Sequence, residues 1–273
     1  MELAVQHQTT YRYATPVNQV ALLLRLRPMA LDNQVIKAWQ VTVNGQLIDS
    51  FQPNAYGDAE ALHLHRGPVS ELEITASGVV ETFDRNGVLS GFGQEPPLGV
   101  FLRQTELTRP DAAVLALAQS VAQEPPIPRL HALSERAHKA IAYAPGSTSA
   151  ATTVAEALAQ GQGVCQDHAH LFVSAARSLG IPARYVAGYL LADEAGHAVR
   201  ETHAWAEAWV DGLGWIGFDP TNRLCVTEQH VRLCVGLDAH DAAPVRGSVQ
   251  GSTEIGIQAQ VVVTPAEAQQ QQQ

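Results

Sequence analysis

One cysteine in the second half of the chain lies where its thiol could act as a nucleophile. Cys165 comes just after Gly161 and Gly163, at the expected first turn of a helix. Two glycines allow a tight turn into a helix, and the free N–H groups and dipole at its start stabilise an anion. A free thiol is only about 3% thiolate at pH 7, and such surroundings increase that fraction. Taken alone, however, a helix cysteine is more often a buried packing residue.

A histidine and an aspartate follow at the ends of two expected strands. His203 begins the run HAWAEAWV and Asp219 ends the run GWIGFDP, with Gly212 and Gly214 marking the turn between them. Adjacent antiparallel strands would place the two side chains together, and a helix packed on that sheet would bring Cys165 to the imidazole. The order thiol, imidazole, carboxylate is that of a nucleophile, its base and the group that orients the base. Each residue alone is more often structural, but the set in this order favours catalysis.

The predicted chemistry is acyl transfer at an amide. His203 would accept the thiol proton and later protonate the leaving amine. The backbone N–H of Cys165 could stabilise the oxyanion, and the Gln166 side chain could add a second donor, although a surface glutamine is the simpler interpretation. We expect no metal and no other cofactor, because the histidine and cysteine spacings do not resemble a ligand set: His63/His65, His168/His170, and Cys225/His230/Cys234.

Composition narrows the class of partner. The 273 residues include 17 Lys+Arg and 27 Asp+Glu, giving a net charge of −10, so we expect neither nucleic acid nor a membrane as partner. No apolar run is as long as a membrane span. Three cysteines are too few and odd in number for a disulfide framework, and the start MELAVQHQTTYRY does not resemble a signal peptide. These features favour a cytoplasmic protein; they do not define its oligomeric state.

The surrounding elements predict an α+β protein. Short runs rich in Val, Thr, Tyr and Leu, with a hairpin turn at Asn44-Gly45, predict antiparallel strands over 1–86, and glycines and prolines mark 87–110 as a linker. Helices are expected over DAAVLALAQSVAQ, through Leu130–Ile141, after a capping box at Thr153/Glu156, and over about 164–179. We divide the chain into a β domain with linker (1–105), a catalytic core (106–237), an extension with a returning strand of undetermined sheet (238–264) and a disordered tail (265–273).

The two segments GVCQDHAHLFVSAARSLGIPARYVAGYL and THAWAEAWVDGLGWIGFDPTN resemble the transglutaminase-like superfamily, which has a papain-like cysteine fold. The match is dense over about 163–223, and TTVAEAL and DAHDAAPVRG also resemble the bacterial branch with an N-terminal β region. The resemblance implies Cys165 as nucleophile, His203 as base and Asp219 as orienting carboxylate. One departure is His168, where this branch usually has an aromatic residue.

The resemblance leaves the acyl acceptor open. Water would make the protein a cysteine peptidase or amidase acting on a peptide or protein amide, and an amine would make it a transglutaminase. A second class of function is a binding or scaffold module that keeps the fold without activity.

Overall fold

The N-terminal region is an antiparallel sheet built on two very long strands. The computed structural model describes residues 1–93, 95–191, 202–250 and 255–266. Strand β1 (Glu2–Arg27) pairs along most of its length with β5 (Ala59–Thr82), and β2 (Gln34–Val43) pairs with the far side of β5. The short strands β3 (Gln46–Leu47) and β4 (Gln52–Pro53) complete this side. Asn44 and Gly45 have φ values of 47° and 76° between β2 and β3, which confirms the predicted hairpin.

The chain returns to this sheet at its C-terminal end. Strands β14 (Val245–Gln250) and β15 (Ile255–Pro265) both pair with β1, on the edge opposite β5. The expected returning strand therefore belongs to the N-terminal sheet, which the sequence left undetermined. Most of the predicted tail, residues 267–273, lies outside the described residues.

A second antiparallel sheet carries the strands predicted around the site. Its order is β12-β11-β10-β9-β13, and β6 also pairs with β11. The strands are β6 (Val88–Leu89), β9 (Ala183–Leu190), β10 (His203–Val210), β11 (Gly214–Asp219), β12 (Leu224–Cys225) and β13 (His230–Gly236). Strand β10 begins at His203 and β11 ends at Asp219, as predicted.

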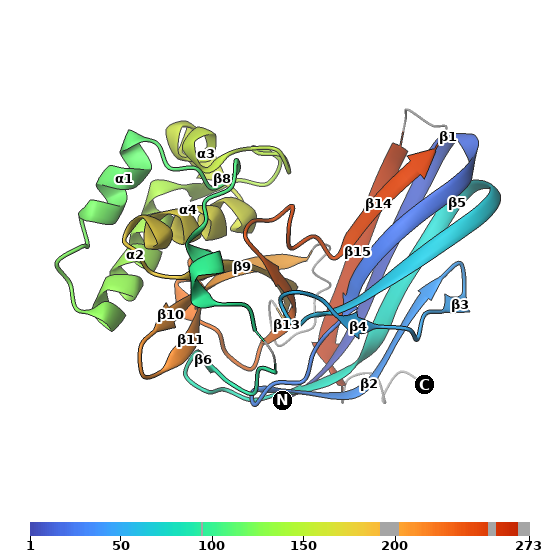
Figure 1. Ribbon diagram of the computed structural model, residues 1–273, viewed down its shortest axis with the longest axis horizontal. Helices are drawn as coiled ribbons and strands as arrows, with labels where there is room; N and C mark the ends of the chain where they lie inside the picture. The colour runs from blue at the N-terminus through green and yellow to red at the C-terminus, as the bar shows by residue number, and fades with distance from the viewer. Residues whose placement is uncertain (94, 192–201, 251–254, 267–273) are drawn as a thin grey trace.

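Helices α1 (Ala112–Gln119), α2 (Pro126–Ala140), α3 (Val154–Gln160) and α4 (Cys165–Ser178) gather on one side of the second sheet (Figure 1). The short helix η1 (Leu98–Leu102) packs against Trp209 and Trp215, on the opposite face of this sheet. The parallel pair β7 (Ala142–Tyr143) and β8 (Gln162–Gly163) precedes α4. The helix expected over DAAVLALAQSVAQ ends early, at Gln119, and turns connect it to α2.

The expected linker is a packed segment. Strand β6 extends the second sheet, and Phe101 in η1 is fully buried with its ring 5.1 Å from that of Trp215. The glycines and prolines that indicated a loop break regular structure here, but the aromatic and aliphatic residues between them still enter the core.

The two sheets share one core. Leu3, Val5 and Leu22 of β1 lie in the same cluster of buried residues as Val231 and Leu233 of β13. Polar groups also cross the boundary, since the Gln34 side chain hydrogen-bonds both the backbone N–H and the C=O of Arg232. The N-terminal sheet is thus fixed against the sheet that carries the site. Within the described residues, no helix is long and apolar enough to cross a membrane.

Candidate active site

Glycines and a capping aspartate set the position of Cys165. Helix α3 ends at Gly161, whose φ of 67° is left-handed, and the chain then reaches α4 through β8. The buried carboxylate of Asp167 accepts hydrogen bonds from the Val164 N–H (2.8 Å) and the Thr148 hydroxyl (2.7 Å). A Cβ at Gly163 would lie 2.6 Å from Asp167 Oδ2, so glycine is required there. Cys165 is therefore the first residue of a capped helix, half-buried at its start.

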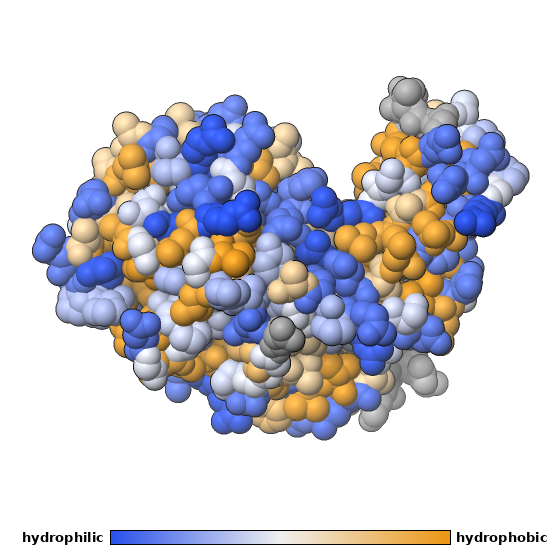
Figure 2. All heavy atoms as spheres, in the orientation of Figure 1, coloured by the Kyte–Doolittle hydropathy of each residue, from blue (hydrophilic) through white to orange (hydrophobic). Residues whose placement is uncertain are grey.

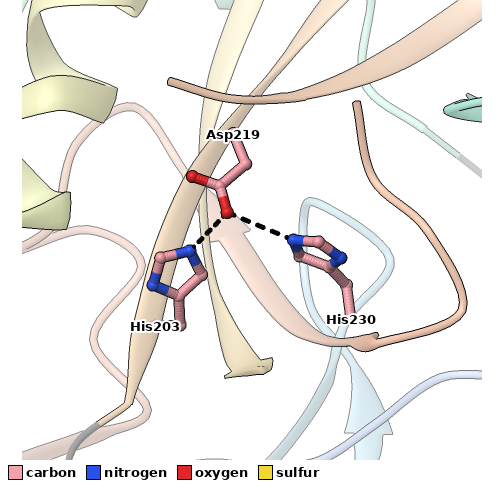
Figure 3. A group of neighbouring side chains, drawn as sticks. All are labelled: His203, Asp219 and His230. Carbon is pink, nitrogen blue, oxygen red and sulfur yellow. Dashed lines mark hydrogen bonds and ion pairs between the residues drawn. The ribbon is translucent and has the colours of Figure 1, made fainter. Parts of the chain in front are cut away.

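His203 and Asp219 are directly hydrogen-bonded. His203 Nε2 lies 2.7 Å from Asp219 Oδ2 (Figure 3), and both side chains are buried. Since Nε2 is engaged by the carboxylate, Nδ1 is the ring nitrogen left for a partner on the other side. Cys165 and His203 line the same cavity, of about 440 Å³, and the thiol interacts with the imidazole. The three residues that the sequence singled out thus meet at one place.

The electrostatics of this group favour a charged pair. Burial alone would lower the pKa of His203, but hydrogen bonds and charge interactions with Asp219 and Cys165 outweigh it and raise the pKa from 6.5 to about 10. Burial likewise opposes ionisation of Asp219, yet its hydrogen bonds from His203 and His230 hold its pKa well below the usual range. The imidazolium and the carboxylate therefore stabilise each other.

Two residues to which the sequence analysis gave no part in the site also bind Asp219. His230 Nε2 lies 3.2 Å from Asp219 Oδ2 (Figure 3), and the Asn222 side-chain amide donates to the same oxygen at 2.7 Å. The Thr227 backbone N–H donates to His230 Nδ1, so the His230 proton is on Nε2, facing the carboxylate. No spacing in the sequence indicates this, because His230 reaches Asp219 only through the pairing of β13 with β9.

The donor atoms of His203, Asp219 and His230 lie within 4.8 Å of one another and could in principle suit a metal ion. The hydrogen bonds argue against this use. Nε2 of His230 carries a proton, and Asp219 Oδ2 already accepts from three donors, so neither atom has the free lone pair that a ligand supplies. The cluster is better described as a hydrogen-bond network centred on the carboxylate.

The two proposed oxyanion donors lie at the start of α4. As the first residue of the helix, Cys165 has a backbone N–H with no acceptor inside the helix. Gln166 lines the same cavity, and its side-chain amide makes a long hydrogen bond of 3.4 Å to the Ser149 carbonyl. One N–H of the amide is thereby directed at the backbone, so the Cys165 N–H is the better placed donor.

The remaining cysteines have surroundings that disfavour thiolate. Cys234 is fully buried and burial raises the pKa of its thiol strongly; burial and Asp84 also raise the pKa of Cys225. The departure at His168 has a structural role: its ring nitrogens hydrogen-bond the Ile141 carbonyl (2.8 Å) and the Thr221 hydroxyl (3.0 Å), behind the site.

Strand β10 also holds a buried ion pair network. The Glu207 carboxylate accepts from Arg184 (2.6 Å) and Arg232 (3.0 Å), and Arg232 reaches Asp58 of the N-terminal region at 3.1 Å. All four side chains are buried. Buried charges need such complementary partners.

Comparison with known proteins agrees with this architecture. Residues 115–220 match the transglutaminase-like superfamily, and residues 3–81 match the bacterial transglutaminase-like N-terminal region. An uncharacterized protein of Mycobacterium leprae is 32% identical over 270 residues, covering 93% of this chain and 96% of the relative. An uncharacterized protein of Mycobacterium tuberculosis is 28% identical over 287 residues, covering 92% and 88%.

A crystal structure of a presumed cysteine protease from Cytophaga hutchinsonii has the same fold. It superimposes with a TM-score of 0.69 at 19% identity and covers 97% of each chain. Together with the sequence matches, this agreement extends over both sheets and the helices. The chain therefore belongs to the transglutaminase-like superfamily, with a transglutaminase-like core that follows a bacterial transglutaminase-like N-terminal region.

Proposed function

We propose that this protein is a cysteine enzyme that hydrolyses an amide bond or transfers its acyl group to an amine. Cys165 is the nucleophile, His203 the base and Asp219 the orienting group. The observation that carries the proposal is the hydrogen bond of 2.7 Å between His203 Nε2 and Asp219, made by a histidine that shares a cavity with Cys165. It leaves Nδ1 of the imidazole for the thiol.

Each residue has a defined part in the reaction. His203 takes the proton from Cys165, and the thiolate sulfur attacks the amide carbonyl carbon to give a tetrahedral oxyanion, which the Cys165 N–H stabilises. The C–N bond then breaks, the amine leaves with the proton from His203, and an S-acyl enzyme remains. Water or an amine attacks this acyl group and gives its proton to His203, and the C–S bond breaks to release the Cys165 thiolate, which restores the thiolate–imidazolium pair. Asp219 stabilises the imidazolium throughout.

The acceptor decides between two activities of the same site. Water gives a peptidase or amidase acting on a peptide or protein amide, and an amine gives a transglutaminase. An amine acceptor requires water to be kept from the acyl enzyme. An intact-mass time course with peptides and a free primary amine separates the two, since the products differ in mass.

A non-catalytic binding or scaffold module is the rival function. It would have no need for a helix-start cysteine beside a histidine held by a buried carboxylate. Labelling by iodoacetamide near pH 6 tests this, because an ordinary thiol barely reacts there. We expect rapid labelling of Cys165, located by peptide mapping, and none in Cys165→Ala. A label on Cys225 or Cys234, or an unreactive Cys165, would contradict the proposed activity.

A further inference from the structure

One face of the N-terminal sheet continues past the core to the cavity that contains Cys165. Near its start, this face is covered: Val5 and His7 of β1 and their partners Val263 and Val261 of β15 are all buried, and His7 hydrogen-bonds Tyr189 of the second sheet. Because side chains alternate across a strand, every second residue further along lies on the same face. On β15 these residues are Ala259, Ile257 and Ile255.

The side chains on this face remain mostly apolar where the second sheet no longer covers them. Ala259 lines the cavity of Cys165 and His203. Two and four residues further, Ile257 and Ile255 line a neighbouring cavity of about 360 Å³ with Tyr11 and Tyr13, their partners on β1. Ala243 lines both cavities, so the two are adjacent. Figure 2 shows the hollow between the N-terminal sheet and the helix-bearing part of the molecule, with apolar residues on the side of the N-terminal sheet.

The two isoleucines are unusually exposed for their type. Ile257 is 63% and Ile255 is 42% exposed, beside tyrosines that are nearly buried. Arg246 is the one Lys, Arg, Asp or Glu among the described residues that line either cavity. Apart from that guanidinium, the lining suits an apolar group.

The edge of β15 adds a second element of recognition. In the described part of the chain, β15 pairs with β1 alone, so its other edge presents unpaired backbone groups. An extended peptide can hydrogen-bond such an edge as an added strand, and its alternate side chains then lie beside those of the edge strand.

We propose that the apolar wall of Ile255, Ile257, Tyr11 and Tyr13 is a substrate subsite that selects an extended peptide with a bulky apolar side chain near the reacting carbonyl. The inference rests on the proposed function and specifies its substrate. Two residues along a strand span about 7 Å and four span about 13 Å. If the peptide residue with the reacting carbonyl lies beside Ala259, the peptide side chains two and four positions from it lie beside Ile257 and Ile255.

Electrophilic peptides test the subsite without knowledge of the natural substrate. Peptidyl chloromethyl ketones place the peptide on the N-terminal side of the reacting carbon, and chloroacetyl peptides place it on the C-terminal side. Both form a C–S bond with the thiol and release chloride. Each series carries Phe or Gly two positions from the reacting carbon, and 2-chloroacetamide serves as a probe with no peptide.

The variant is Ile255→Asn/Ile257→Asn, matched by Leu62→Asn/Leu64→Asn. Leu62 and Leu64 are 64% and 47% exposed on β5. They pair with Leu23 and Ala21, on the face opposite Leu22, which lines the same cavity as the apolar wall. In the unmodified protein we expect the Phe probe of one series to label Cys165 at least about tenfold faster than the Gly probe. The isoleucine variant should reduce this ratio to below about threefold, and the leucine variant should leave it unchanged.

The outcomes separate the subsite from the proposed function. If chloroacetamide labels Cys165 but the ratio is near one in both series, or is equal in the isoleucine variant, the subsite is refuted and the thiol chemistry stands. If chloroacetamide does not favour Cys165 over Cys225 and Cys234, the proposed function fails and the subsite with it. Equal chloroacetamide rates in all variants show that the site is intact; if the double variant does not fold, Ile257→Asn alone replaces it.

Discussion

Replacement of Asp219 by asparagine should remove the buried negative charge that stabilises the His203 imidazolium. The substitution keeps the size of the side chain and its ability to accept a hydrogen bond, but it removes the negative charge that faces His203 Nε2 at 2.7 Å. Burial of His203, which opposes the imidazolium, is unchanged. We therefore expect Asp219→Asn to fold and to lose the ability to hold a proton on His203 near neutral pH.

The expected size follows from the pKa of His203. Its increase from 6.5 to about 10 favours the imidazolium by about 5 kcal/mol, at 1.36 kcal/mol per pKa unit. Asp219 and Cys165 share this effect, so loss of the carboxylate should remove roughly 2 kcal/mol or more. That corresponds to about a 30-fold smaller population of the thiolate–imidazolium pair. On the analogy of triad enzymes, kcat should fall by a few hundred- to about ten-thousand-fold.

The assay is the rate of iodoacetamide labelling of Cys165 between pH 5 and 9, read by intact mass. Asp219→Asn should slow labelling at pH 6 by about 30-fold or more, with a far smaller loss at pH 9. The matched control is Asp238→Asn, because Asp238 is also buried but its carboxylate accepts from the Asp241 backbone N–H and makes no hydrogen bond to the proposed triad. It should not slow labelling. An unchanged pH profile in Asp219→Asn, with an unchanged circular dichroism spectrum, would reduce Asp219 to a turn residue.

Three further outcomes are expected. His230→Phe should lower kcat about tenfold while KM changes little, because a charged acceptor loses one donor, and His230→Gln should restore part of the rate; equal rates in all three proteins would contradict this. Burial lowers the pKa of His7 and His170 to about 4, so below pH 6.5 the unfolded chain binds more protons than the folded one. The free energy of unfolding should therefore fall by roughly 3 kcal/mol per histidine between pH 6.5 and 4. Urea titrations that show no such loss of stability would refute this prediction. Activity should survive dialysis against EDTA and increase with dithiothreitol, since a solvent-accessible thiolate is readily oxidised. Loss of activity with EDTA and its recovery with zinc would overturn the thiol mechanism.

The sequence predicted the parts of the site that lie at the ends of regular elements. Strand alternation placed His203 at the start of β10 and Asp219 at the end of β11, and a glycine-rich turn placed Cys165 at the start of α4. These are local signals: a helix start needs a turn, and antiparallel strands joined by a short turn must be neighbours. The geometry follows almost without knowledge of the rest of the chain.

The supports of Asp219 could not be predicted in this way. His230 reaches the carboxylate because β13 pairs with β9, which precedes it by 39 residues between strand ends. Such a pairing depends on non-local packing, which the periodicity of apolar residues along the sequence does not indicate. The ion pairs of Glu207 could not be predicted for the same reason, since its two arginine partners lie on β9 and β13.

The N-terminal sheet is part of what holds the site. His230 begins β13, and this strand is fixed from outside its own sheet: Gln34 bonds both backbone groups of Arg232, and the Thr82 hydroxyl donates to the Glu228 carbonyl. Asp58 neutralises the guanidinium of Arg232. A core expressed without residues 1–105 would leave that buried arginine short of a partner and β13 free to shift, so His230 would lose its position beside Asp219. The β region therefore has two functions at the site. It holds the hydrogen-bond network of Asp219 in place, and its β1–β15 face forms the wall along which we propose that the substrate lies.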